Sequence, residues 1–230
     1  MKLTSAKTLF INIHTHKDTC GSGELALINI FAEDFENYLL REGCYYTAGL
    51  HPWKIAGVSA EAAINAVRKA SVHKNILAIG EAGLDRAIAV PLDVQSELFI
   101  AQLQIAEAVK KPLMIHCVRA VSDIIAIRKR FKFTTPWIIH GFNGNSQSAG
   151  QLLKHNCYLS FGKFLFNKKS RVPATFPEVP DDLFFLECDD SNMSIEEIYL
   201  RACELKNITL EELKLQMAKN FNNLFFRDYE

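Results

Sequence analysis

Side chains that bind metal ions recur at one kind of position in this sequence: each lies at the end of a short apolar run or just past it. Five of the seven histidines follow this rule, and two carboxylates follow it as well. Runs of this composition are typical of buried β-strands. The side chains concerned are His14, His16, His51, Glu81, His116, His140 and Asp189.

A divalent metal ion is the simplest partner for such a group. Imidazoles and ionised carboxylates gathered on one concave surface lose hydration, and the carboxylates repel one another, unless a cation lies among them. His14 and His16 are two residues apart on an extended segment, so both side chains point to the same side. A single histidine in such a place is more often a packed or loop residue, but agreement among seven positions favours a metal centre.

The apolar runs that precede these residues predict eight strands. Most of the runs are continuously apolar rather than alternating, which is typical of strands covered on both faces in a parallel sheet. The predicted strands are residues 9–13, 26–31, 44–50, 76–80, 112–116, 136–140, 157–161 and 183–187.

Helical patterns lie between the predicted strands. The clearest covers residues 95–110, where apolar side chains recur at spacings of three and four. Two capping boxes predict where the last two helices begin. In these, Ser194 and Thr209 are each followed three residues later by a glutamate, Glu197 and Glu212.

Strands and helices in this order predict a (β/α)8 barrel, with a single domain over residues 1–230. The first connection, HTHKDTCGSGEL, is polar and too short for a full crossover helix, so the first helix is expected to be short or missing. Active sites of such barrels form at the C-terminal ends of the strands, where the candidate ligands lie. For residues 163–182 we favour a solvated loop with a short helix over a basic substrate-binding patch.

The composition narrows the class of protein. The chain has 26 basic and 26 acidic residues, and 49% of its 230 residues are hydrophobic, which excludes a disordered protein. A formal charge of zero disfavours a general basic binder of nucleic acid, so such binding has to come from local patches or bound metal ions. No apolar run approaches the ~18 residues of a membrane span, and the opening residues lack signal-peptide features. We expect a cytoplasmic protein that does not bind membranes and has no obligate protein partner.

Several motifs appear together and in one order along nearly the whole chain. They are NIHTH, GLHPW, AIGEAGLD at 78–85, PLMIHCVRA at 112–120, IIHGFNG at 138–144, YLSFG at 158–162, LECDDS at 186–191 and a closing KNFNNLFF. In these motifs the chain resembles the TatD-type metal-dependent deoxyribonucleases, which are amidohydrolase-like barrels. AIGEAGLD is the most specific of them.

The resemblance implies two divalent metal ions, which would be Mg, Mn, Zn, Ni or Fe. An imidazole-rich ligand set suits Zn, Mn, Fe or Ni, and the family implies activity with Mg. Asp85 is similar to an acid that supports the ligands in the family; a helix N-cap or turn residue is an equal alternative. The implied ligands are His14, His16, Glu81 and Asp189 for the first ion, and His116, His140 and the bridging Glu81 for the second.

The activity implied by the resemblance is hydrolysis of a phosphodiester in DNA. Hydroxide activated by the two ions would attack phosphorus, and Asp189 would accept the proton, with Glu81 as the second catalytic carboxylate. His51 would contact a substrate phosphate or water, or would merely pack on Trp53. Arg119 and Lys163 are candidate phosphate clamps, although such exposed cations are usually only solvated.

The chain departs from the family pattern at four places. Asn12 stands where an acid is usual, and it can orient a ligand but cannot take a proton. Trp53 replaces a frequent histidine, Arg86 replaces an aromatic residue, and Asp190-Ser191 replaces a proline-tyrosine loop. Because these positions lie around the expected substrate rather than at the six ligands, we expect intact metal chemistry with altered specificity.

Two other functions stay open. The same site in a related hydrolase would cleave an ester, for example an aminoacyl ester on RNA. Hydrolysis of an amide bond is a less favoured alternative, because Glu81 occupies the position where cyclic-amide hydrolases of the superfamily commonly carry a modified lysine. Alternatively, the chain is a homologue that retains its metal but has no catalytic activity.

Overall fold

The computed structural model of the chain describes residues 9–18, 21–38, 40–41 and 44–226. Its internal contacts divide it into two compact units. We call Ile28–Ile139 the central unit, and Met1–Leu27 together with His140–Glu230 the terminal unit. This division does not test the prediction of a single domain over residues 1–230, which stays a prediction.

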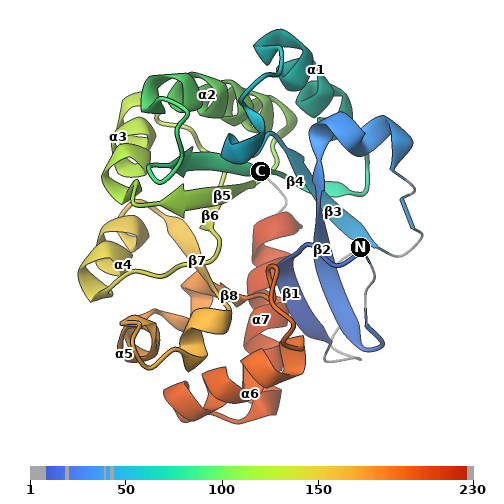
Figure 1. The fold of residues 1–230 in the computed structure, drawn as a ribbon. Coiled ribbons are helices and arrows are strands. Elements are labelled where there is room, and N and C mark those ends of the chain that lie inside the picture. The colour runs from blue at the N-terminus through green and yellow to red at the C-terminus, as the bar shows by residue number, and fades with distance from the viewer. Residues whose placement is uncertain (1–8, 19–20, 39, 42–43, 227–230) are drawn as a thin grey trace. The chain divides into compact units, whose positions relative to one another are not determined.

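The central unit consists of parallel strands connected by helices (Figure 1). Strand β3 pairs with β4, β4 with β5, and β5 with β6, each in parallel. Helix α2 packs against β4, and α3 packs against β4 and β5. The elements are β3 (Tyr45–Gly49), α1 (Ala60–Ser71), β4 (Ile76–Asp85), α2 (Leu92–Val109), β5 (Leu113–Val118), α3 (Val121–Phe131) and β6 (Trp137–Ile139).

The terminal unit contains the first and last strands. β7 and β8 are parallel neighbours, and α6 and α7 pack against β1 (Figure 1). Strand β2 (Glu24–Phe31) begins in this unit and ends in the central unit. The other elements are β1 (Phe10–Thr15), α4 (Ser146–Leu153), β7 (Cys157–Phe161), α5 (Val172–Thr175), β8 (Phe184–Leu186), α6 (Ile195–Lys206) and α7 (Leu210–Phe225).

Each of the eight predicted strands is present within a few residues of its predicted bounds. Both predicted capping boxes form, at Ser194 and Thr209. Between β1 and β2, the residues that the structure describes contain no helix, as expected from the short first connection. The segment 163–182 contains the four-residue α5 and short 3-10 turns, in agreement with a loop and short helix.

Strand β4 is longer than predicted. The predicted strand stops at residue 80, but β4 continues to Asp85, so Glu81 lies inside a strand rather than just past its end. The glycines of GEAGLD suggest a turn, yet here they allow β4 to approach β5 closely. Gly83 pairs with His116, and a Cβ atom at Gly83 would clash with the carbonyl oxygen of His116. The helix N-cap alternative for Asp85 is also wrong, because α2 begins after Pro91.

Glu107 connects α2 to the segment that precedes β6. Its carboxylate accepts hydrogen bonds from the backbone N–H groups of Thr134 and Thr135, each at 3.0 Å. Burial acts to raise the pKa of Glu107, but the bonds from Thr134 and Thr135 hold this pKa below its ordinary value. The charged form of Glu107 therefore stabilises the folded central unit.

Replacing this carboxylate tests that contribution. We expect Glu107→Gln to lower the free energy of unfolding at pH 7 by about 1–2 kcal/mol, because the amide offers one neutral acceptor oxygen in place of two charged ones. The folded-state pKa lies below the ordinary value of 4.5, so the stabilisation is present above pH 4.5 and is lost as the pH falls through the folded-state pKa. Urea unfolding at pH 7 and at about pH 4 should show a smaller difference between the two proteins in acid. An equal difference at both pH values would contradict this account.

Candidate metal centre

Glu81 belongs to a group of polar side chains in the central unit. The group, which we call the central cluster, consists of His51, Trp53, Glu81, Asp85 and His116. Glu81 is almost fully buried, with 3% of its surface exposed. Its backbone N–H donates to the side-chain oxygen of Asn29 at 2.8 Å, and the hydroxyl of Thr47 donates to the same oxygen at 2.9 Å. Strands β2 and β3 thus hold the backbone of β4 in place at Glu81.

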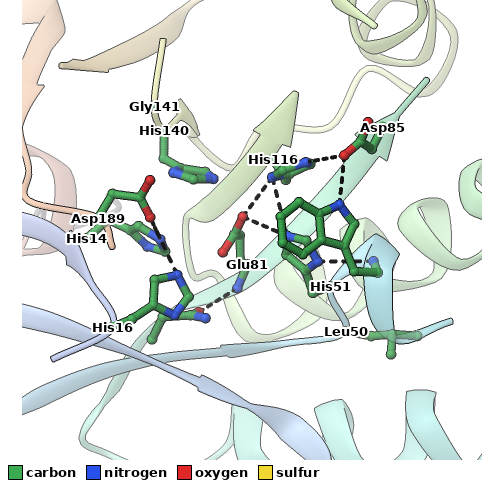
Figure 2. Close-up of polar contacts among 12 residues, drawn as sticks. His14, His16, Leu50, His51, Glu81, Asp85, His116, His140, Gly141 and Asp189 are labelled. Atoms are coloured by element: carbon green, nitrogen blue, oxygen red, sulfur yellow. Dashed lines mark hydrogen bonds and ion pairs between the residues drawn. The ribbon is translucent and has the colours of Figure 1, made fainter. Parts of the chain in front are cut away.

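His116, two residues before the end of β5, lies between two carboxylates (Figure 2). Its Nδ1 is 2.8 Å from Glu81 Oε1, and its Nε2 is 3.0 Å from Asp85 Oδ2. Asp85 also accepts hydrogen bonds from the indole N–H of Trp53 and from the backbone N–H of Ala87, each at 2.8 Å. Burial acts to raise the pKa of Asp85, but these donors and His116 hold this pKa below its ordinary value.

This arrangement orients the imidazole of His116. An ionised Asp85 can only accept hydrogen bonds, so Nε2 of His116 carries a hydrogen atom and donates a hydrogen bond to Asp85. Nδ1 of His116 then faces Glu81 Oε1 at 2.8 Å and the Nε2 atom of His51 at 3.3 Å, on the side of the ring that is left for a metal ion. A histidine that ligates a metal commonly donates its other N–H to a carboxylate in this way. The donor set of Glu81 and His116 therefore fits a metal ion.

His51 has a different role in the central cluster. Its Nδ1 accepts a hydrogen bond from the backbone N–H of Trp53 at 3.0 Å, so the proton of the neutral ring is on Nε2. That Nε2 is 2.9 Å from Glu81 Oε1 and donates to it. His51 is thus arranged to donate to an anion, which agrees with the predicted contact to a phosphate better than with a metal ligand.

A second group of metal-binding side chains lies in the terminal unit. This group, the terminal cluster, consists of His14, His16, His140, Glu187 and Asp189. Figure 2 shows His14, His16 and Asp189 pointing toward one another. Asp189 Oδ1 is 3.7 Å from His14 Nε2 and 3.5 Å from His16 Nε2. The rings of His14 and His140 are also adjacent, with centroids 4.3 Å apart.

Main-chain pairing places these residues together although they are far apart in the sequence. Thr15 and Asp189 form a parallel β-bridge. On either side of it, Asp189 N–H donates to the carbonyl of His14 at 3.0 Å and His16 N–H donates to the carbonyl of Asp189 at 3.3 Å. The end of β1 is therefore held against the segment after β8, which fixes all three side chains at one strand end.

The spacing of these donor atoms fits a shared ion. Separations of 3.5 and 3.7 Å exceed an ordinary hydrogen bond. Two atoms bound to one metal ion at about 2.1 Å lie roughly 3.0–3.7 Å apart for angles of about 90–125° at the ion. The ligand atoms of His14, His16 and Asp189 all lie within 4.8 Å of one another, as do those of His51, Glu81 and His116. The terminal cluster can therefore hold a metal ion with its own residues, whereas in the central cluster Glu81 and His116 offer two ligands, because His51 is arranged as a donor.

Glu187 is a member of the terminal cluster that sequence reasoning missed. It is fully buried, its Oε1 accepts a hydrogen bond from Gly141 N–H at 2.7 Å, and the same oxygen is 3.6 Å from His140 Nδ1. Burial acts to raise the pKa of Glu187, but His140 holds this pKa below its ordinary value. The sequence carried one signal for it, because Glu187 is a carboxylate at the end of a predicted strand, two residues before Asp189.

The structure places the other predicted contact residues near the ends of strands. Lys163, beyond β7, forms an ion pair with Asp190 and lies 3.7 Å from Asp189 Oδ2. A substrate phosphate would therefore compete with Asp190 for this cation. Arg119 is exposed just beyond β5, with a left-handed backbone (φ 53°). Substrate binding by His51, Arg119 and Lys163 stays a prediction.

Three of the residues at which the chain departs from the family pattern form specific contacts. Asn12 donates to Glu24 Oε1 at 2.7 Å and accepts from the backbone N–H of Cys188 at 3.0 Å, so it supports the segment that carries Asp189. Arg86 forms a two-bond ion pair with Asp123. Trp53, which was expected only to face substrate, donates to Asp85 and so supports His116 indirectly.

The contact between Asp85 and His116 leads to a testable expectation. Asp85→Asn should lower the affinity for divalent metal by about 10- to 100-fold, because the charged acceptor that orients the His116 ring is lost. Asp123→Asn is the matched control, since Asp123 pairs with Arg86 outside the cluster. Titration of both variants with Mn²⁺ in the presence of a competing chelator measures the affinity. Equal affinities in the two variants would refute the orienting role of Asp85.

Comparisons with known proteins agree with these features. The sequence profile of the family described as TatD related DNase matches residues 31–226. Over 148 residues the chain is 32% identical to an uncharacterized metal-dependent hydrolase, YabD, of Bacillus subtilis, covering 63% of this chain and 58% of that protein. Over 152 residues it is 30% identical to the 3'-5' ssDNA/RNA exonuclease TatD of Cronobacter turicensis, covering 64% of this chain and 57% of that protein. The chain thus spans less than three fifths of the length of these curated relatives.

Solved structures share the fold. The crystal structure of YjjV, a TatD homologue of Escherichia coli, superposes with a TM-score of 0.83 at 21% identity, over 96% of this chain and 99% of that one. A TatD family hydrolase of Entamoeba histolytica gives a TM-score of 0.77 at 15% identity, over 95% and 98%. These likenesses confirm the predicted (β/α)8 fold class. Among the residues that the structure describes, no helix combines the length and the apolar character needed to cross a membrane.

Proposed function

We propose that this chain, which belongs to the TatD related DNase family, is a divalent-metal-dependent phosphodiesterase that acts on DNA. The observation that carries the proposal is the pairing of imidazoles with carboxylates in both clusters, with the ligand atoms of His14, His16 and Asp189 at spacings that fit a cation. The similarity to a protein named as a single-stranded DNA and RNA exonuclease supports the choice of substrate. A cytoplasmic location and the lack of an obligate protein partner stay predictions.

Two ions would be held by the predicted ligands. His14, His16 and Asp189 would hold one ion, and Glu81 and His116 would hold the other. His140 as a ligand of the second ion, and Glu81 as a ligand shared by both, rest on the family resemblance alone. The imidazole-rich set suits Zn, Mn, Fe or Ni, with Mg implied by the family. Bound divalent ions lower the pKa of water and neutralise charge on the phosphate oxygens.

The chain's own groups supply the rest of the chemistry. Asp189 is one-fifth exposed and would accept a proton from water. His51 presents an N–H at Nε2, which can donate to an oxygen of the phosphate. Arg119 is an exposed cation that would attract the phosphate backbone. Lys163 would partly neutralise Asp189 and Asp190 and so reduce their repulsion of the substrate.

Parallel assays separate the proposed function from its rivals. The purified chain is incubated with a single-stranded DNA oligonucleotide labelled at either end, with bis-p-nitrophenyl phosphate, and with an aminoacyl ester of RNA. Its metal content is measured by inductively coupled plasma mass spectrometry. We expect metal to be present and DNA to be shortened. Cleavage of the aminoacyl ester without cleavage of any phosphodiester would show the ester hydrolase instead. Metal without turnover on any substrate would show a non-catalytic homologue.

A further inference from the structure

Trp53 is a large aromatic residue that is both exposed and held in place. It lies in a 3-10 turn (Pro52–Lys54) that directly follows His51, and 65% of its surface is exposed. Its indole N–H donates to Asp85 at 2.8 Å, and its backbone N–H donates to His51 at 3.0 Å. The first bond holds the indole and the second holds the turn that carries it, so the exposed ring keeps one orientation.

The rings around Trp53 belong to the central cluster. The ring of Trp53 makes an edge-to-face contact with His51 at 4.9 Å between centroids, and with His116 at 5.9 Å. A flat apolar surface is therefore held beside two imidazoles of the proposed phosphodiesterase site. Hydrating this surface is unfavourable, and the cost is removed when a planar group covers it.

Support of Asp85 does not by itself require an indole. A histidine side chain also has an N–H donor and is much smaller. The additional ring area of Trp53 stays mostly in water, so it contributes little to the packing of the central unit. The exposed aromatic surface of Trp53 is suited to binding a ligand that has a planar face.

We infer that Trp53 is a stacking platform for a nucleobase of the substrate, next to the phosphodiester that is cleaved. The inference rests on the proposed function and adds to it a residue that contacts the substrate base. Bases of single strands are free to stack on aromatic side chains, whereas bases within a duplex are already stacked on their neighbours. The platform therefore selects single-stranded nucleic acid and gives little preference among bases, because every base has a planar face.

Tryptophan fluorescence provides a direct test. The chain contains two tryptophans, and the other, Trp137, is fully buried in the central unit and serves as an internal reference. The metal-loaded protein is titrated with a single-stranded oligonucleotide whose phosphorothioate linkages slow hydrolysis, and with a matched oligonucleotide that is abasic at its ends. We expect the first to quench the fluorescence and the second to bind about 5- to 150-fold more weakly with little quenching. Equal binding and no quenching would overturn the inference.

Two substitutions separate stacking from support of Asp85. Trp53→Phe keeps a stacking ring and loses the indole N–H, whereas Trp53→His keeps an N–H donor and loses most of the ring area. Stacking predicts that Trp53→Phe retains the preference for base-containing over abasic ends in KM, and that Trp53→His loses it. If Trp53 acts only through Asp85, Trp53→Phe will lower kcat and metal affinity, Trp53→His will restore both, and neither variant will change the preference for base-containing over abasic ends; an unchanged preference in Trp53→His would overturn the inference.

The outcomes for the inference and for the proposed function are distinct. If the wild-type chain hydrolyses base-containing and abasic substrates with equal kcat/KM, the inference fails and the phosphodiesterase proposal stands. If the wild-type chain hydrolyses no phosphodiester, the proposed function fails. The fluorescence titration still decides in that case whether Trp53 stacks on bases.

Discussion

Asp189→Asn should reduce the rate of phosphodiester hydrolysis by about 10³-fold or more, without unfolding the chain. The carboxylate of Asp189 lies 3.5 and 3.7 Å from the Nε2 atoms of His16 and His14, where the proposed function requires a metal ligand and a proton acceptor. A neutral amide can neither balance the charge of an ion there nor take a proton. Asp189 has a left-handed backbone (φ 51°), which asparagine adopts as readily as aspartate does, so the fold should persist.

The neighbouring residue supplies the control for this substitution. Asp190→Asn removes the same charge one residue later, from a side chain that pairs with Lys163. Steady-state hydrolysis of a labelled oligonucleotide is measured for both variants, together with their thermal unfolding. We expect Asp190→Asn to keep most of the activity. Similar losses in both variants would indicate a general electrostatic effect and would exclude a specific role of Asp189.

Glu81→Gln should cause a loss of similar size, about 10³-fold, and should also lower the number of metal ions bound per chain. Glu81 Oε1 is 2.9 Å from His51 Nε2 and 2.8 Å from His116 Nδ1. The amide of glutamine carries no charge, and its N–H group can donate to Nδ1 of His116 and occupy the lone pair that would bind the ion. Because glutamine has nearly the same volume, the buried position should be filled without a cavity.

Metal content and turnover are measured together for this variant, with Glu107→Gln as the control. Glu107 lies in the same unit and its substitution removes the same charge, but its partners are Thr134 and Thr135. We expect Glu107→Gln to keep its metal and its activity. A Glu81→Gln variant that keeps both would remove Glu81 from the proposed ligands.

Much of the site is predictable because it depends on strand ends. Continuous apolar runs identify buried parallel strands, and a polar residue directly after such a run has to lie at one edge of the sheet. This reasoning identifies His14, His116 and Asp189 from the order of residues alone. The capping boxes at Ser194 and Thr209 are equally reliable, because they depend only on residues three positions apart.

The features that escaped prediction depend on contacts between distant residues. The length of β4 depends on how closely Gly83 approaches His116, which no local pattern records. The bond from Trp53 to Asp85 joins residues 32 positions apart. Glu187 was overlooked because it was counted as the last residue of the predicted strand 183–187. In the structure β8 ends at Leu186, so Glu187 lies just past the strand, as Asp189 does.

The most direct measurement of the central claim is hydrolysis of a single-stranded DNA oligonucleotide before chelation, after exhaustive chelation, and after Mn²⁺ is restored, with metal content determined at each step. If the histidine and carboxylate clusters bind the ions that drive the reaction, activity will disappear with the metal and return with it. Full hydrolysis by a chain shown to be free of metal would contradict the account.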